Sequence, residues 1–497
     1  MYWANFLHIY QPFGQQADIL ESVVAQSYRP LVNGVLKSPN TKLTLNVTGA
    51  LLELFDKYGY LDLIDGLRQA GDEGKIEFTG SAKYHALLPF LDEDEIVNQI
   101  KINDQTNRFY LGDVYKPSGF FPPEMAYSPI LAPILDSLGF KWIIIDEIAY
   151  NGEADHVDYT KLYQITGTKL KVFFRERRIS NLIMSAVVRT TDSLVHAIKD
   201  DLASSRYVLT GMDGETFGHH RPGLETLLFD IFSDSRFDLV TVSQLLDKYH
   251  QIQDVQPVVS TWASSPADIK GETQFISWKD RENSLHTLQW ELFTLTHNLV
   301  RQMDKNHSLY KRTRKDMDIA CASDHYFWAS TKPWWSLEMI EEGAFRLLEI
   351  AKKVPDADKQ IAQKAQNLYH QIISTAFTWQ RTNMVRRQAQ EQKSLLRIPF
   401  RDRTEGVGGE MAVEFTAFID LMKQQEEKAA QNREYEAAVL WRDAIYKLEN
   451  KLDIYDALHV VDMLRIQIGN EEVEKVIAEY KQQYRQIRGG QPEQRGN

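Results

Sequence analysis

The first half of the chain alternates short apolar runs with longer amphipathic segments. Short apolar runs bounded by turn residues indicate buried strands, and apolar residues at three- and four-residue spacing indicate helices. We expect strands at 2–10, 42–49, 75–80, 119–124, 141–147, 170–177, 207–213, 238–242 and 257–263, and helices among them at 60–72, 93–111, 129–138, 191–203 and 223–233. Repeated strand–helix units favour an α/β fold with a parallel sheet, closed into an incomplete TIM-type barrel. An open doubly wound sheet is the alternative, but the glycines of GDEGK at 71–75 have the wrong spacing for a phosphate loop.

From about residue 282 the strand pattern fades and helical patterns take over. The segments 283–305 and 333–354 both carry apolar residues at helical spacing, whereas the last 30 residues are polar. We therefore expect three parts: a barrel at 1–275, an all-α helical domain at 276–420, and a helical hairpin with a polar tail at 421–497.

The composition argues against several classes of protein. The net charge of −12 disfavours nucleic-acid binding, which usually needs a basic surface. The single cysteine, Cys321, cannot form an internal disulfide and suits a reducing compartment. The N-terminus lacks the charged start and apolar centre of a signal peptide, and no stretch reaches the roughly 18 apolar residues of a membrane span. We expect a cytoplasmic protein that binds neither nucleic acid nor membrane.

Polar and titratable side chains gather where the expected strands end, which is where TIM-type barrels carry their catalytic groups. The first strand ends at His8 and Gln11, the third at His85, and the fourth at Glu124. The other candidates are Asp146 and Glu147 after the fifth strand, Asp213, Glu215, His219 and His220 in MDGETFGHH at 212–220, and Trp262 in the last strand.

Glu124 and Asp213 are the strongest pair among these candidates. Glu124 has apolar and proline neighbours, so burying its carboxylate is costly without partners or a function. Each residue also has a structural interpretation: Glu124 could cap a helix starting near Met125, and Asp213 could brace the glycine-rich turn that follows it. Two carboxylates on different strands of one barrel rim are the arrangement that glycoside hydrolysis needs.

Six sequence blocks resemble glycoside hydrolase family 57, the family of α-amylases, amylopullulanases and 4-α-glucanotransferases. They occur in family order over roughly residues 1 to 350. The blocks are LHIYQPFGQ near the start, LNVTGALLELF at 45–55, EFTGSAKYHALLP at 77–89, GFFPPEMAYSP at 119–129, MDGETFGHH at 212–220 and ASDHYFWASTKPWWSLEMIE at 322–341.

This resemblance implies a (β/α)7 barrel, a helical domain that completes the cleft, and a glycosidase that acts on α-glucans with retention. It places the nucleophile at Glu124 and the acid/base at Asp213. Substrate contacts are expected at His8, Gln11, His85, Glu215, His219, Trp262, Asp324 and Trp328. Tyr10 departs from the commoner HxHQP block, because it stands where a second histidine often stands and cannot carry a positive charge.

The sequence leaves three alternatives open. Transfer to a sugar, as in a 4-α-glucanotransferase or branching enzyme, would replace hydrolysis if the cleft excludes water. A non-catalytic glycan-binding relative would not need both carboxylates. His219 and His220 could hold a metal, but neither HExxH nor HxxxH occurs, so we expect no metal and no cofactor.

Two features lie outside the catalytic blocks. The chain holds 10 Trp, 22 Tyr and 23 Phe, and we expect Trp328 or Tyr326 to stack on a sugar while Trp278 and Trp290 lie in the core. The segment 424–451 resembles the UVR helical hairpin, which predicts a protein contact, and an ordinary solvated hairpin is the alternative. Because no catalytic block lies beyond residue 350, we expect the tail to be separable from catalysis.

Overall fold

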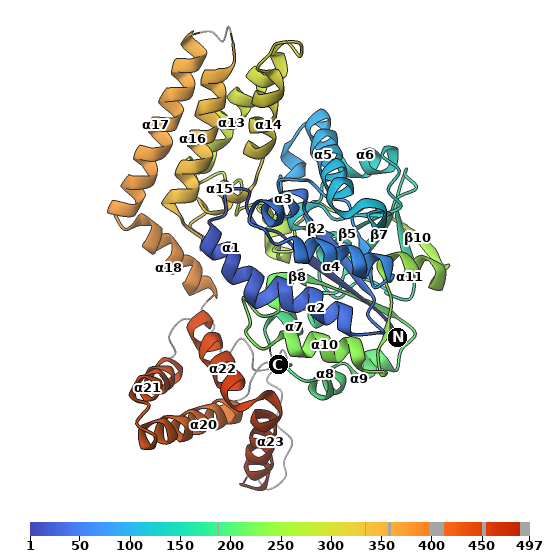
Figure 1. Ribbon diagram of the computed structural model, residues 1–497, viewed down its shortest axis with the longest axis vertical. Coiled ribbons are helices and arrows are strands. Elements are labelled where there is room, and N and C mark those ends of the chain that lie inside the picture. The colour runs from blue at the N-terminus through green and yellow to red at the C-terminus, as the bar shows by residue number, and fades with distance from the viewer. Residues whose placement is uncertain (187, 333, 356–358, 397–411, 450–453, 488–497) are drawn as a thin grey trace.

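A computed structural model describes the chain except for residues 187, 333, 356–358, 397–411, 450–453 and 488–497 (Figure 1). Its strands form two sheets, one in the order β3-β2-β1-β8 with β9 paired to β1, the other in the order β10-β6-β7-β5-β4. The strands are β1 (Tyr2–Ile9), β2 (Leu43–Val47), β3 (Ile76–Phe78), β4 (Gly119–Phe120), β5 (Trp142–Asp146), β6 (Leu162–Ile165), β7 (Lys171–Arg175), β8 (Tyr207–Asp213), β9 (Asp238–Leu239) and β10 (Ile252–Val255).

Backbone hydrogen bonds join the two sheets at both edges and close a barrel. The amide of Phe121 donates to the carbonyl of Gly80 (2.9 Å), which joins β3 to β4, and the amide of Glu176 donates to the carbonyl of Leu209 (2.8 Å), which joins β7 to β8. The ring therefore runs β1-β2-β3-β4-β5-β7-β8, with parallel pairing wherever two of these strands form a ladder. This is the incomplete (β/α)7 barrel that the sequence predicts.

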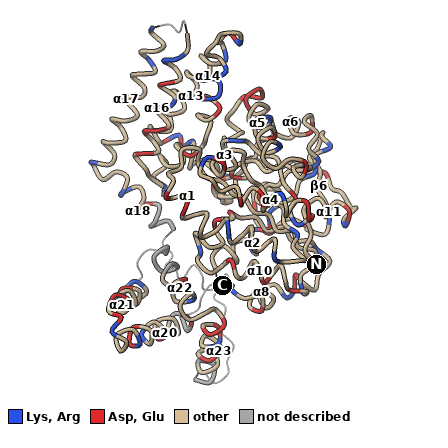
Figure 2. Tube along the Cα trace, viewed as in Figure 1, with Lys and Arg blue, Asp and Glu red and all other residues tan. Residues whose placement is uncertain are grey.

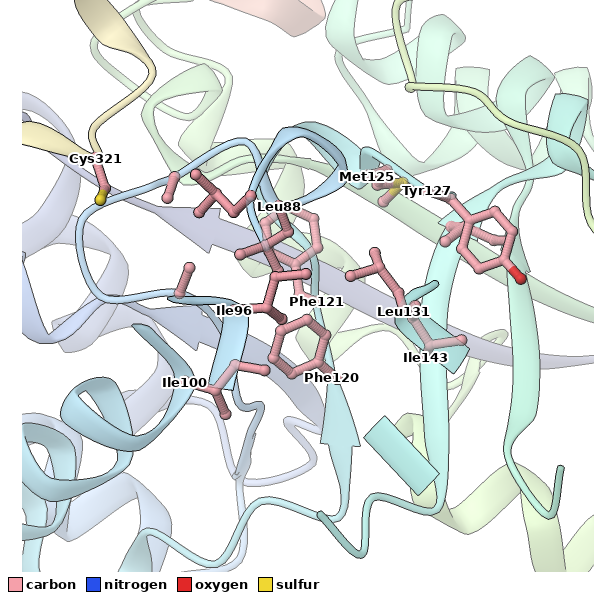
Figure 3. Close-up of a cluster of buried hydrophobic side chains, with 14 of the residues drawn as sticks. Leu88, Ile96, Ile100, Phe120, Phe121, Met125, Tyr127, Leu131, Ile143 and Cys321 are labelled. Carbon is pink, nitrogen blue, oxygen red and sulfur yellow. The ribbon is translucent and has the colours of Figure 1, made fainter. Parts of the chain in front are cut away.

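Helices cover the outside of the barrel (Figure 1). Strands such as β1, with seven of eight residues buried, are apolar on both faces because the barrel interior and the helical layer each cover one face. Figure 3 shows Phe120 and Phe121 of the β4 segment packed with Leu88, Ile96 and Ile100. The helices are α1 (Ala17–Val23), α2 (Arg29–Lys37), α3 (Gly49–Lys57), α4 (Leu61–Asp72), α5 (Glu93–Leu111), α6 (Leu131–Ser137), α7 (Arg177–Met184), α8 (Thr191–Ala197), α9 (Lys199–Leu202), α10 (Glu225–Ser233), α11 (Val242–Lys248) and α12 (Pro266–Gly271).

One expected strand is wrong, and two strands were not expected. Residues 257–263 form no strand: Ser260 makes only an isolated bridge with Tyr127, and a turn follows in which the amide of Ser264 donates to the carbonyl of Thr261. The strands β6 and β10 pair with each other outside the ring. Three of the four residues of β10 are exposed, so no apolar run marked it in the sequence.

The helical domain begins with α13 and packs against the barrel. Glu95 of α5 accepts hydrogen bonds from His297 of α13 (3.1 Å) and Arg314 of α14 (3.1 Å). Arg314 is one of several basic residues on α14, which stand together in Figure 2. The helices are α13 (Ser284–Gln302), α14 (Tyr310–Ala320), α15 (Asp324–Phe327), α16 (Leu337–Lys353), α17 (Lys359–Arg381) and α18 (Met384–Leu396).

The last four helices, α20 (Ala412–Gln431), α21 (Tyr435–Glu449), α22 (Ile454–Ile468) and α23 (Asn470–Ile487), form a bundle with its own apolar core. The boundary expected between residues 420 and 421 falls inside α20, whose Ala417 and Phe418 already belong to that core, so we place the boundary before α20. The hairpin expected at 424–451 corresponds to the end of α20 and α21, and its last two residues lie outside the described residues. Its likeness to the UVR hairpin stays a prediction.

Within the described part of the chain, no helix combines the length and the apolar character that crossing a membrane requires.

Candidate active site

Glu124 lies just beyond β4, in the single helical turn Pro123–Met125. Its φ of 62° is in the left-handed region, as is the φ of 47° at Met125, and such values are uncommon for residues other than glycine. Trp262 holds this turn twice: its amide donates to the carbonyl of Glu124 (3.2 Å), and its indole Nε1 donates to Oε2 of Glu124 (2.8 Å). The N-cap of the turn is Pro122 and no side chain caps it, so the helix-cap interpretation of Glu124 is wrong.

Asp213 is the last residue of β8 and lies beside the end of β1, where His8 is its register partner. Its side chain makes no capping hydrogen bond to the turn Gly214–Thr216 that follows. The bracing interpretation is therefore wrong as well, and the carboxylate of Asp213 is available for another purpose.

The electrostatics of this pair suit acid/base chemistry. Burial raises the pKa of Glu124 to about 8, the negative charge of Asp213 adds to this shift, and the hydrogen bond from Trp262 opposes it. Burial also raises the pKa of Asp213 to about 6, against the positive charge of Arg175. With these pKa values, Glu124 holds a proton at pH 7 and Asp213 is mainly ionised.

Three stacked rings form a wall beside Glu124. The ring centroids of Tyr10 and His85 are 4.3 Å apart, and those of His85 and His8 are 5.2 Å apart. His85 Nε2 lies 3.9 Å from Oε1 of Glu124, and its φ of 56° is a further left-handed value at the site. Burial lowers the pKa of His8 to about 4 and lowers the pKa of His85 well below its ordinary value, so both imidazoles are neutral at pH 7.

Second partners fix the orientation of these rings. Nδ1 of His8 is 2.8 Å from Oδ1 of Asn46, and Nδ1 of His85 is 3.2 Å from the hydroxyl of Ser323. The hydroxyl of Tyr10 donates to Oδ2 of Asp324 (2.7 Å). Burial raises the pKa of Asp324 to about 6, against this hydrogen bond from Tyr10. The helical domain thus supplies Asp324 and Ser323 to the same wall.

Glu215 points below the rim. It is 5% exposed, and its Oε1 accepts hydrogen bonds from the hydroxyl of Tyr28 and from the amide of Tyr10 (3.3 Å). Gln11 donates to the hydroxyl of the same Tyr28 (3.2 Å). These contacts place Glu215 and Gln11 between the ends of β1 and β8, and the substrate contact expected of both residues stays a prediction.

The loop after Asp213, residues 214–224, packs against a π-helical turn, Val24–Tyr28, in the first strand–helix connection. The hydroxyl of Ser27 donates to the carbonyl of Gly214 (3.0 Å), and Nδ1 of His219 is 2.7 Å from Oε1 of Gln26. Gly218 has a φ of 104°, and a Cβ there would lie 1.8 Å from the carbonyl oxygen of Gln26, so only glycine fits. His219 therefore contacts this turn.

Comparison with known proteins identifies the family. The family model "Glycosyl hydrolase family 57" matches residues 3–256, half of the chain. The chain belongs to this family.

Family 57 relatives share limited identity with this chain. An α-amylase from Pyrococcus horikoshii is 25% identical over 263 residues, which cover 49% of this chain and 40% of the relative. A 4-alpha-glucanotransferase from Thermococcus kodakarensis is 24% identical over 306 residues, which cover 57% of this chain and 46% of the relative. The matched region is thus less than half the length of these relatives.

Solved structures of family 57 enzymes share the fold of this chain. The branching enzyme from Pyrococcus horikoshii has a TM-score of 0.58 at 16% identity, covering 76% of this chain and 96% of that one. The 4-alpha-glucanotransferase from Thermococcus litoralis has a TM-score of 0.56 at 18% identity, covering 72% of this chain and 59% of that one.

The aromatic residues of the segment 322–341 divide between core and surface. Tyr326 is 1% exposed and stacks on Trp290, with ring centroids 4.2 Å apart, so it is a core residue and not a sugar platform. Trp278 is also buried, as expected. Trp328 is half-buried with Trp334 at its edge (5.6 Å), and it remains the candidate for stacking on a sugar.

Two arginines that the sequence analysis overlooked connect the strand ends and the Trp262 turn around Glu124 and Asp213. Arg175, at the end of β7, donates to Oδ2 of Asp146 (3.0 Å) and to the carbonyl of Gly211 in β8 (2.6 Å). Arg177 donates to the same Asp146 (2.5 Å) and to the carbonyl of Trp262 (3.1 Å). The arginines of FFRER at 173–177 were a visible signal, because charged residues directly after a buried strand need partners.

The residues considered as metal ligands are not gathered into a site. Among the residues that the structure describes, no group of three or more His, Cys, Asp or Glu side chains could hold a metal ion. The rings of His219 and His220 are 5.4 Å apart and tilted.

Proposed function

We propose that this family 57 chain is a retaining glycosidase that acts on α-glucans, with Glu124 as nucleophile and Asp213 as acid/base. The observation that carries the proposal is the pair of carboxyl groups, Glu124 and Asp213, that the ends of β4 and β8 present at one barrel rim. The printed names of the relatives, α-amylase, 4-alpha-glucanotransferase and branching enzyme, support an α-glucan as substrate.

The reaction starts from the form of the pair in which Glu124 is ionised and Asp213 holds the proton. Glu124 attacks the anomeric carbon while Asp213 gives its proton to the leaving glycosidic oxygen, which forms a covalent glycosyl-enzyme. Two features favour this form: the indole N–H of Trp262 stabilises the ionised Glu124, and so does positive charge that develops on the sugar ring.

Asp213, now ionised, then removes a proton from the acceptor as the acceptor attacks the glycosyl-enzyme. Water as acceptor gives hydrolysis, whereas a sugar hydroxyl gives transfer to a new chain. In a retaining enzyme the two carboxyl groups lie about 5–5.5 Å apart, which is the separation we expect here.

The remaining predicted site residues surround the bound sugar in this proposal. The neutral imidazoles of His8 and His85 and the carboxylate of Asp324 offer hydrogen-bond partners for sugar hydroxyls. Trp262 supports Glu124, and Trp328 stacks on a neighbouring sugar. His219 contacts substrate only if it leaves Gln26.

A product profile on maltoheptaose, amylose and pullulan tests the proposal. Hydrolysis increases the number of reducing ends. Transfer gives a ladder of longer and shorter chains with no net gain in reducing ends. NMR of the first product resolves its anomer, and an α-anomer product is expected from retention. A β-anomer product would contradict retention, and no change in any of the three glucans would contradict the proposed substrate class.

The variant Glu124→Gln should lose the product profile, because it removes the nucleophile. The variant Glu77→Gln is its matched control. Like Glu124, Glu77 is a half-buried barrel glutamate, but it accepts hydrogen bonds from Thr44 (3.1 Å) and from the amide of Ser243 (3.1 Å), away from the pair. Its variant should keep the product profile that Glu124→Gln loses.

A further inference from the structure

The C-terminal bundle buries a carboxylate against the barrel. Asp462 of α22 is 1% exposed and pairs with Arg189, which is also 1% exposed, and Nη1 of Arg221 lies 3.7 Å from its Oδ2. A buried charge without a partner is strongly unfavourable. The negative charge of Asp462 in the bundle is therefore paired with positive charge on the barrel. Figure 1 shows α22 as the bundle helix beside the barrel. All four bundle helices lie beyond the part of the chain that the family model matches.

Both arginines contact the loop that directly follows Asp213. The carbonyl of Arg221 accepts hydrogen bonds from the amides of Gly218 (3.3 Å) and Leu224 (3.0 Å), so its position sets the shape of loop 214–224. Arg189 donates to the carbonyl of Pro222 in the same loop (3.2 Å). Asp462 thus reaches this loop through both arginines.

Arg221 also connects to the cation that faces Asp213. Its Nε donates to the carbonyl of Met184 at the end of α7 (3.2 Å), and the sulfur of Met184 accepts from Arg175 (3.4 Å). Arg175 in turn holds the carbonyl of Gly211, two residues before Asp213. The loop and the strand end are therefore joined to Asp462 by a continuous set of contacts.

We propose that Asp462 is a positioning residue for the acid/base: through Arg189 and Arg221, the C-terminal bundle holds loop 214–224, and with it Asp213, in the reactive geometry. The part of the proposal that concerns turnover rests on the proposed function, and the part that concerns the loop does not. The proposal replaces the expectation that the tail is separable from catalysis.

The physical reason is the cost of leaving two guanidinium groups without their shared carboxylate. Without Asp462, Arg189 and Arg221 gain free energy by moving toward water, and loop 214–224 moves with them. A displacement of about 1 Å at a reacting group lowers turnover by on the order of 100-fold. The residues expected to bind the sugar, such as His8, His85 and Asp324, lie on other elements. KM should therefore change less than kcat.

The test compares Asp462→Asn with Glu474→Gln in the full-length chain. Glu474 accepts a hydrogen bond from Arg465 (2.8 Å) inside the bundle, so its variant controls for loss of a bundle ion pair. We expect Asp462→Asn to lower kcat on maltoheptaose by about 10- to 100-fold, to leave KM within about twofold, and to speed hydrogen exchange in residues 214–224. Glu474→Gln should keep wild-type kcat and wild-type exchange.

A second variant keeps the test decisive if Asp462→Asn does not fold. Replacing a buried ion pair by apolar residues is often neutral for stability, so Arg189→Met/Asp462→Leu should fold. The double variant still removes the Asp462 carboxylate that lies near Arg221, so turnover should fall.

Wild-type kcat and wild-type exchange in either Asp462 variant would overturn the proposal, and so would an equal loss in Glu474→Gln. If the wild-type chain has no activity on glucans, the proposed function fails, while the exchange comparison still decides whether Asp462 holds the loop.

Discussion

Trp262→Phe tests how the proton is shared between Glu124 and Asp213. The change keeps an aromatic ring but removes the indole N–H that donates to Oε2 of Glu124 (2.8 Å). Because this hydrogen bond lowers the pKa of Glu124, its loss raises that pKa above the wild-type value of about 8. A hydrogen bond to a charged group contributes about 1.5–3 kcal/mol, and about 1.4 kcal/mol corresponds to one pH unit. The expected shift is therefore about one to two pH units.

The direction in which Trp262→Phe changes kcat/KM follows from which of the two carboxyl groups, Glu124 or Asp213, holds the proton. In the wild type, kcat/KM should be bell-shaped with limbs near pH 6 and pH 8, because the reactive form carries one proton on the pair. In the variant, the alkaline limb moves up, because Glu124 holds its proton to higher pH. The plateau of kcat/KM falls by about 10- to 100-fold. The reactive form has its single proton on Asp213, and a smaller share of the variant molecules is in that form.

The two profiles should converge above the variant's alkaline limb. There Glu124 is ionised in both proteins, so only the protonation of Asp213 limits the rate. The assay is kcat/KM for maltoheptaose from initial rates between pH 5 and 10. The control is Trp335→Phe, which removes an indole hydrogen bond to the uncharged Gln380 (2.7 Å) and should leave both limbs in place. An equal loss of rate at every pH, with an unmoved alkaline limb, would refute this reasoning and indicate that Trp262 acts by contacting the sugar.

Three further predictions concern the catalytic pair, metal dependence and stability. Asp213→Asn should lower turnover by about 100- to 10,000-fold, and Glu124→Gln should remove nearly all turnover; melting curves should show both folded, and near-wild-type turnover in either would remove that residue from its role. Exhaustive EDTA treatment should leave activity unchanged, whereas loss of activity restored by zinc or calcium would revive the histidine-ligand hypothesis. Burial raises the pKa of Glu95, but the hydrogen bond from His297 and the charge of Arg314 bring it down to about 2. Its stabilisation is thus complete above the unfolded pKa of about 4.3 and is lost as the pH falls through about 2. Glu95→Gln should lower the free energy of unfolding by about 3–5 kcal/mol at pH 7, with a smaller difference at pH 2 in urea titrations, and equal stability at pH 7 would contradict it.

The sequence alone predicted the barrel, the order of its main strands and the two candidate catalytic carboxylates. The reason is that parallel strands buried on both faces leave continuous apolar runs, and the residues that follow them gather at one end of the barrel. Glu124 and Asp213 could therefore be paired without knowing any contact between them. The exposed strand β10 had no such run, and the apolar residues at 257–263 turned out to form a turn that supports Glu124.

The tertiary structure decided what each candidate contacts. Glu215 stands two residues from Asp213, yet its carboxylate turns to Tyr28 below the rim, and Tyr326 turns to Trp290 in the core. Asp462 looks like any charged residue of an amphipathic helix, but it is buried against Arg189. Local periodicity reports only whether a side chain faces an apolar or a polar environment. Which distant residue it meets there depends on how separate elements pack, and that is decided only when the whole chain has folded.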